Sequence, residues 1–231
     1  MCGRFALYGP IKRHRGAKDE GEGQGWISDI IDAINTRPPR YNFAPTQTAP
    51  IVHATAEGTV IEDMRWGLVP AWAKDAKIGN KAINARVETV AEKPMFRSAF
   101  KTRRCLVPAN GYFEWKGTAP NKQPYFIHAP DKSMLIFAGL WERWWPVKDA
   151  EPVQTFTIIT GPPGLVSGDI HDRAPVILPS ALWNDWLTAE PARALELLAA
   201  VPEPELTYYP VSKAVGSPRN STPDLVEPIA A

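Results

Sequence analysis

Short apolar runs bounded by turn residues recur along most of the chain, a pattern typical of β-strands. Two such runs, at 50–54 and 59–65, flank Glu57-Gly58 and predict a hairpin. Further strands are predicted at 103–107, 124–128, 134–140, 153–160, 175–178 and 206–211. Because these strands do not alternate regularly with helices, the pattern disfavours a doubly wound sheet and favours a single β-rich α+β domain.

Helical spacing of apolar residues is confined to short segments. From Trp26 to Asn35, apolar side chains recur at the spacing of helical turns, and Pro38-Pro39 would end that helix. A second helix is expected after Pro179 with Ser180 as its N-cap, and a third over roughly 190–200. The glycine-rich and charged residues 9–25 predict a loop. We expect one domain over 1–220, and a loose C-terminal tail over 221–231.

Composition limits the classes of protein that fit. A chain of 231 residues, 44% of them hydrophobic, can bury the core of one large domain. The net charge of +1 excludes a simple polycation, so contacts with nucleic acid must come from local basic patches. The sequence contains neither an apolar run of membrane length nor the apolar segment of a signal peptide. We therefore expect a cytoplasmic or nucleoid-associated protein in which Cys2 and Cys105 form no disulfide.

Sequence motifs for a metal or nucleotide cofactor are missing. The chain has no CxxC or HExxH spacing, no Walker lysine loop and no GxGxxG. The run Gly161-Pro162-Pro163-Gly164 predicts a turn, because proline removes the amide donors that a phosphate cradle needs. We expect neither a metal nor an organic cofactor.

The candidate nucleophile is Cys2, in the opening run Met1-Cys2-Gly3-Arg4-Phe5. If Met1 is removed, Cys2 carries a free α-amine beside its thiol. The amine can condense with an aldehyde to give a Schiff base, and the thiol can then close on the imine carbon to give a five-membered thiazolidine. An α-amine ordinarily titrates at about 7.7–8.0 and a thiol at about 8.5, so a modest base suffices near neutral pH. Gly3 would let the backbone approach a ligand, and Arg4 could hold a phosphate.

Glu114 and His171 are the candidates for acid–base chemistry. Glu114 lies among aromatic residues in Gly111-Tyr112-Phe113-Glu114-Trp115, where loss of water would raise its pKa. The alternative is an exposed glutamate on an edge strand. His171 is preferred over the other histidines because Asp172 and Arg173 follow it directly.

Three further segments combine polar or aromatic side chains with glycine or proline. Trp66-Gly67 and Trp72 precede Lys74, Lys77 and Lys81, which suits stacking on bases and contact with phosphates of a single strand. The alternative is two core tryptophans beside a solvated loop. The polar residues of 84–88 share one strand face, which is either solvated or lines a groove. Residues 40–45 are consistent with a loop that enters a strand.

Taken in order, these segments resemble the SOS-response-associated peptidase family. The resemblance runs through almost the whole chain, and it is highly specific because its motifs occur in register. After the opening Cys2-Gly3-Arg4, these motifs are Arg40-Tyr41-Asn42, Trp66-Gly67 with Trp72, Asn84-Ala85-Arg86 with Glu88, Phe113-Glu114-Trp115 and Ile170-His171-Asp172-Arg173. The resemblance implies curved antiparallel sheets that form a barrel-like core, with a few flanking helices.

The resemblance also implies a function in DNA repair and the SOS response. Members bind single-stranded DNA and crosslink to abasic sites, with lyase-type and cysteine-type autopeptidase chemistry. By resemblance, the Cys2 amine attacks the sugar aldehyde, Glu114 takes the proton of the amine, Asn84 holds the sugar, and His171 helps to open it. Thiol capture would then remove an imine that invites β-elimination and strand cleavage. The DNA contacts implied are Gly3, Arg4, Asn42, Pro45, Trp66, Trp72, Arg86, Thr160 and Arg173.

Two other functions stay open, and both would suit the expected monomer. An N-terminal-nucleophile amidohydrolase would use the Cys2 thiol on an amide, with Asn110-Gly111 as its oxyanion donors. A plain single-strand-binding module would use no chemistry at all. The chain departs from the family pattern at Ala73, where some members carry a second tryptophan, and at Ala174, where a larger or basic residue is common. The Lys12–Gly25 loop has no clear counterpart.

Overall fold

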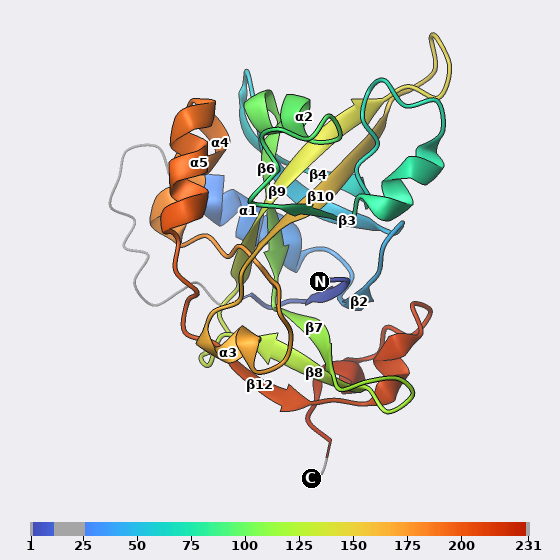
Figure 1. The fold of residues 1–231 in the computed structure, drawn as a ribbon, viewed down its shortest axis with the longest axis vertical. Helices are drawn as coiled ribbons and strands as arrows, with labels where there is room; N and C mark the ends of the chain where they lie inside the picture. Colours follow the sequence, from blue (N-terminus) through green and yellow to red (C-terminus); the bar gives the residue numbers. More distant parts are fainter. Residues whose placement is uncertain (1, 12–25, 230–231) are drawn as a thin grey trace.

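The computed structural model describes residues 2–11 and 26–229, which form a β-rich fold with helices at its margins (Figure 1). Most of the loop expected at 9–25 lies outside the described residues. The strands are β1 Arg4–Leu7, β2 Arg40–Phe43, β3 Thr48–Thr55, β4 Gly58–Trp66, β5 Asn84–Arg86, β6 Arg104–Ala109, β7 Gly111–Lys116, β8 Gln123–His128, β9 Leu135–Trp144, β10 Val153–Gly161, β11 Ala174–Pro175 and β12 Thr207–Pro210. The helices are α1 Trp26–Asn35, α2 Arg97–Thr102, α3 Leu165–Gly168, α4 Trp183–Thr188 and α5 Pro191–Ala200. Four 3₁₀ segments accompany them, at Ala76–Lys81, Ser180–Leu182, Lys213–Gly216 and Pro223–Val226.

Five strands close into a barrel. The strands pair in the order β10, β4, β3, β6 and β9, and β9 pairs in turn with β10. The predicted hairpin forms β3 and β4, which pair from Thr48 opposite Arg65 to Thr55 opposite Gly58. Gly58 lies in the left-handed region with φ of 137°, which a glycine tolerates at this turn. The barrel-like core expected from the resemblance is confirmed, although β10 runs parallel to β4 instead of antiparallel.

A second sheet carries the N-terminus of the chain. Its strands lie in the order β12, β8, β7, β1 and β2, and Figure 1 shows β7, β8 and β12 below the barrel. Phe5 of β1 joins the two layers, because its ring packs edge-on against Trp66 at 5.2 Å and Phe137 at 6.4 Å between centroids. Both partners are barrel residues that are buried almost completely. Residues adjacent to β1 therefore lie where the two layers meet.

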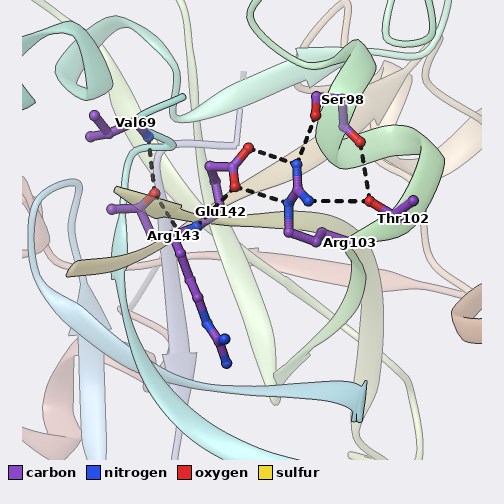
Figure 2. A network of polar contacts seen from close by, with 7 residues as sticks. Val69, Ser98, Thr102, Arg103, Glu142 and Arg143 are labelled. Carbon is purple, nitrogen blue, oxygen red and sulfur yellow. Dashed lines mark hydrogen bonds and ion pairs between the residues drawn. The ribbon is translucent and has the colours of Figure 1, made fainter. Parts of the chain in front are cut away.

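A buried carboxylate, Glu142 of β9, ties helix α2 to the barrel (Figure 2). Its oxygens lie 2.9 Å from Nε and Nη2 of Arg103, an ion pair in which Nη2 donates to Oε2. On the adjacent strand β10, the hydroxyl of Thr155 accepts from the backbone amide of Val69 at 2.9 Å. Val69 follows the end of β4 directly, so this bond fixes the start of the segment that leads to Trp72.

The helices cover the barrel from outside. Helix α1 has the bounds that its apolar spacing predicts, and it buries Ile30, Ile31 and Ile34. The helix expected after Pro179 begins differently, because Ser180 lies inside a 3₁₀ turn and makes no capping hydrogen bond. The chain enters that turn from an extended Pro179, and α4 follows it directly. In the described residues, no helix is long and apolar enough to cross a membrane.

The C-terminal residues pack on the second sheet as far as residue 229. Leu225 and Val226 are buried against Ala6 and Phe113, and the expectation of a loose tail is therefore wrong for 221–229. Periodicity gave no hint of this docking, because the segment contributes only a short 3₁₀ turn. Apolar burial holds it together with hydrogen bonds, such as Ile229 N–H to the carbonyl of Pro210 at 3.0 Å and the Tyr209 hydroxyl to the carbonyl of Val226 at 2.6 Å.

Candidate active site

Cys2 and Glu114 are brought together by the pairing of β1 with β7. Arg4 lies opposite Phe113 and Phe5 opposite Tyr112, so the residues before Arg4 run alongside the end of β7. Cys2 is fully buried and Glu114 is 3% exposed. Because β7 has neighbours on both sides, Glu114 is not the exposed edge-strand glutamate of the alternative interpretation.

Burial sets the protonation of this pair. It raises the pKa of the Glu114 carboxyl above its ordinary value, while His171 acts in the opposite direction. Burial also raises the pKa of the Cys2 thiol well above its ordinary range, and the nearby Glu114 adds to that effect. The thiol is therefore protonated at neutral pH, and the carboxyl is suited to exchange protons closer to neutrality.

His171 borders a cavity of about 430 Å³ together with Glu114. The remaining lining residues are Trp115, Lys122 and Gly216. The His171 Nδ1 atom lies 3.1 Å from the backbone nitrogen of Arg173 and 2.8 Å from Oδ1 of Asp172. The amide can donate to a neutral imidazole, and the carboxylate can accept from a protonated one. The site thus offers His171 a partner in both of its protonation states.

Asn84 begins β5, the short strand that pairs with β10, and its side-chain amide is buried. Strand β5 pairs in parallel with β10, with Asn84 opposite Ile158 and Arg86 opposite Thr160. Within the described residues, both side-chain polar atoms of Asn84 and the hydroxyl of Thr160 are buried without a hydrogen-bond partner. A buried polar atom without a partner costs roughly 1–3 kcal/mol, so a water molecule or a ligand that bonds these atoms would be stabilised there.

Arg173 connects β5 and β10 to the segment that carries His171. Its guanidinium pairs with the Glu88 carboxylate through two contacts, one of them Nη2 to Oε2 at 3.0 Å, and it donates to the Thr160 carbonyl at 2.6 Å. The hydrogen bond from Arg173 holds the pKa of Glu88 below its ordinary value. The structure therefore places the Asn84–Arg86 strand beside the residues that follow His171.

Arg4 and Asn42 bind the C-terminal segment of the chain. The Arg4 guanidinium donates to Oδ1 of Asn42 at 3.1 Å and to the carbonyls of Val215 at 2.6 Å and Gly216 at 2.8 Å. Asn42 is fully buried, and its amide lies within hydrogen-bond distance of the carbonyls of Val215, Ser217 and Asn220. Because Gly216 lines the cavity, these two residues shape its rim. Residues 40–43 form strand β2 in place of the loop that was expected there.

The two tryptophans of the third motif have opposite environments. Trp66 is 1% exposed and donates from its indole to the carbonyl of Ile83 at 2.9 Å. Trp72 is 60% exposed. Gly67 separates Trp66 from the loop with φ of 115°, and a side chain there would meet the carbonyl of Gly79 at 2.6 Å. After this turn the chain stays buried through Leu68 and Val69, and only then presents Trp72 to solvent.

The other expected contacts differ in how accessible they are. Arg86 is exposed, and Gly3 and Pro45 are half-buried.

Sequence reasoning did not single out Lys122, a cation that lines the cavity from the connection between β7 and β8. Strand β7 was not among the predicted strands; its pairing with the predicted strand at 124–128 would have indicated Lys122, because a hairpin turn returns its residues to the end of the first strand. Among residues 2–11 and 26–229, no three His, Cys, Asp or Glu side chains group as a metal site.

Known proteins resemble this chain over nearly its whole length. The family model described as SOS response associated peptidase (SRAP) matches residues 1–218. The chain is 37% identical to the abasic site processing protein YoqW of Bacillus subtilis over 98% of this chain and 99% of that protein. It is 31% identical to the abasic site processing protein YedK of Escherichia coli, over 99% of this chain and all of that one. A solved structure from Bacteroides thetaiotaomicron superposes with a TM-score of 0.76 at 26% identity, covering 98% of this chain and 100% of the other. The chain therefore belongs to the SOS response associated peptidase family, as its motifs predicted.

Proposed function

We propose that this protein processes abasic sites in single-stranded DNA by forming a covalent adduct through Cys2. The observation that carries the proposal is that Glu114 lies beside the buried Cys2 and shares a cavity with His171. An opened abasic sugar carries an aldehyde, which is the partner that a 1,2-aminothiol requires. The names of the relatives YoqW and YedK support the same substrate.

The first stage joins the amine to the aldehyde. After Met1 is removed, the Cys2 nitrogen attacks the aldehyde carbon, a C–N bond forms, and the carbonyl oxygen takes a proton from His171. Glu114 accepts the proton that the nitrogen loses, and its raised pKa suits it to return that proton to the departing hydroxyl. Water leaves, the resulting iminium gives its remaining N–H proton back to His171, and a neutral imine remains.

The second stage protects the DNA strand. The Cys2 sulfur bonds to the imine carbon, the π electrons of the C=N bond move to nitrogen, and nitrogen gains the proton that the thiol gives up. Since burial keeps the thiol protonated, it carries this proton into the reaction. The thiazolidine removes the imine, and with it the route to β-elimination and strand cleavage.

DNA would reach the cavity along the exposed and unpaired groups around it. Trp72 is accessible for stacking on a base, and Arg86 for a phosphate. Asn84 and Thr160 offer buried polar atoms to the sugar. Arg4, Asn42, Trp66 and Arg173 are engaged within the protein, so we propose that they support the binding surface, with Gly3 and Pro45 beside it. We expect a cytoplasmic, nucleoid-associated monomer.

The intact mass of the purified protein tests the proposal, before and after incubation with an oligonucleotide that carries one abasic site. We expect a starting mass without Met1 and a heat-stable gain of one oligonucleotide. Cys2→Ala should lose the stable adduct but can still form a reducible imine through its amine. Cys105→Ala is the matched control, because Cys105 is equally buried but lies on β6. Binding without a gain in mass would leave the single-strand-binding module.

Autopeptidase activity is the second part of the proposal. Hydrolysis of the Met1–Cys2 peptide bond would free the amine, with Glu114 as the group that accepts a proton from water. Met1 retained in Glu114→Gln but absent from the wild type would support self-processing. Met1 absent from both proteins would assign its removal to another peptidase.

Asn110, the candidate oxyanion residue of the amidohydrolase alternative, is engaged within the fold. The Asn110 side-chain oxygen accepts from the backbone amide of Tyr8 at 2.7 Å, which joins β1 to the turn before β7. Asn110 is also largely buried. Glutamine turnover by the purified protein would nevertheless restore this alternative.

A further inference from the structure

Glu203, in the connection between α5 and β12, holds the start of the segment that leads to His171. Its carboxylate accepts from the backbone amides of Gly164 at 3.3 Å, Val166 at 3.0 Å and Ser167 at 3.3 Å. The hydroxyl of Ser167 makes a further, short hydrogen bond to Oε1. The first amides of a helix have no partner inside the helix, and a carboxylate satisfies both their hydrogen bonds and their partial positive charge.

Gly164 is the residue that allows this approach. A Cβ atom built on Gly164 would lie 2.5 Å from the Cβ of Glu203, closer than real side chains come. Any other residue at 164 would therefore push Glu203 away. By contrast, a Cβ atom on Gly168 would meet only Pro163, at an ordinary 3.7 Å.

Ser167 passes the constraint on to His171. It is 1% exposed, and its carbonyl accepts from the backbone amides of Ile170 at 3.1 Å and His171 at 3.0 Å. Glu203 therefore binds the amide and the hydroxyl of Ser167, and the carbonyl of Ser167 in turn binds the amide of His171. His171 then faces the cavity that it shares with Glu114.

We propose that Glu203 is a positioning residue that keeps His171 at the cavity beside Glu114. Glu203 does not itself border that cavity, and its hydrogen bonds run to the segment 164–171. The inference rests on the proposed function, in which His171 supplies a proton during adduct formation. It adds a residue from the C-terminal third of the chain to the reaction.

The first test compares rates of adduct formation with DNA affinity. In Glu203→Ala we expect adduct formation to slow by roughly 10- to 100-fold, the usual effect of a misplaced catalytic group, with DNA affinity within about twofold of wild type. Glu203→Gln keeps one oxygen acceptor and should recover part of the rate. Gly164→Ala should slow the reaction as Glu203→Ala does, and Gly168→Ala is its matched control. A wild-type rate in Glu203→Ala would overturn the proposal.

A double-mutant cycle separates positioning from a general loss of stability. If Glu203 acts through His171, Glu203→Ala should slow adduct formation no further when His171 is already alanine. Full additivity of the two effects would overturn the proposal, because a merely structural residue would slow both backgrounds equally.

Hydrogen exchange gives a readout that does not depend on the reaction. In Glu203→Ala we expect faster exchange at the amides of Val166, Ser167 and His171, since the carboxylate that holds them is gone. Unchanged exchange at His171 would overturn the positioning role. A wild-type protein that forms no adduct would instead refute the proposed function, and the exchange data would still decide what Glu203 does.

Discussion

Replacing Asn42 by alanine separates the two roles that this residue could have. The sequence motif implies a DNA contact, whereas the structure shows a fully buried amide between β2 and the C-terminal segment. In Asn42→Ala, the carbonyls of Val215, Ser217 and Asn220 lose their shared donor. Arg4 loses one acceptor at the same time. The perturbation therefore falls on the segment 212–229 and on the cavity rim at Gly216.

The magnitude follows from the number of bonds lost. The two amide hydrogens of Asn42 serve three carbonyls, at 2.9 to 3.1 Å, and the side-chain oxygen accepts one bond from a charged group. Because two hydrogens make at most two full hydrogen bonds, the neutral bonds contribute about 1 kcal/mol each. With about 1.5 kcal/mol for the bond from Arg4, the loss in the free energy of unfolding is about 3–4 kcal/mol. For a domain of this size, that corresponds to a fall in Tm of roughly 6–16 °C.

Urea unfolding measures the global loss, and limited trypsin digestion measures local opening of the segment. Trypsin has exposed targets there at Lys213 and Arg219, so we expect faster cleavage at these sites in Asn42→Ala. Asn220→Ala is the matched control, because it removes a single bond, to the Ala214 carbonyl at 2.8 Å. A loss below about 1 kcal/mol in Asn42→Ala would refute the reasoning. Reduced DNA affinity at unchanged stability would favour the direct contact.

Three further predictions address charge and exposure at the site. Glu114→Gln should be more stable than wild type at pH 8, because a carboxyl with a raised pKa contributes stability that is lost as pH rises through that pKa. Below about pH 4 the two proteins should unfold at the same urea concentration. An equal difference in stability at both pH values would contradict this prediction. Trp72→Ala should weaken binding of single-stranded DNA by about 1–3 kcal/mol in a fluorescence titration. Trp145→Ala is the control, because Trp145 is also exposed, at 47%, and its loss should leave the affinity unchanged. Equal losses of affinity in the two variants would exclude a specific stacking role for Trp72. Arg86→Ala should lower the slope of log affinity against log salt by about 0.7, the value for one phosphate contact on a single strand, and Arg193→Ala on α5 should leave the slope at its wild-type value.

Burial explains which site predictions remained ambiguous at the level of sequence. Alternation of polar and apolar residues places Glu114 and Trp66 on strands but does not say which strand lies at an edge. The order of the second sheet puts β7 between β8 and β1, and this makes Glu114 an interior residue with a raised pKa. Trp66 and Trp72 differ because Trp66 ends barrel strand β4, whereas Trp72 lies in the loop that follows the buried Leu68 and Val69.

Local pattern determined several of the elements, and the motifs determined the family. Apolar spacing alone is enough for α1 and for the β3–β4 hairpin, because each depends on contacts between residues close in the chain. The motifs around Cys2, Glu114 and His171 likewise carried the family assignment. Ser180 was assigned wrongly as a cap because the local signal does not distinguish a 3₁₀ turn from the first turn of an α-helix.

Only the tertiary structure decided which residues meet. The docking of 221–229, the tie of Asn42 to that segment and the hold of Glu203 on α3 join residues that are far apart in the chain. No periodicity encodes such contacts, because they depend on how the two sheets pack and on which polar groups lose water when they do. The sequence alone therefore determined the candidate chemistry of Cys2, and packing decided the environment in which that chemistry would take place.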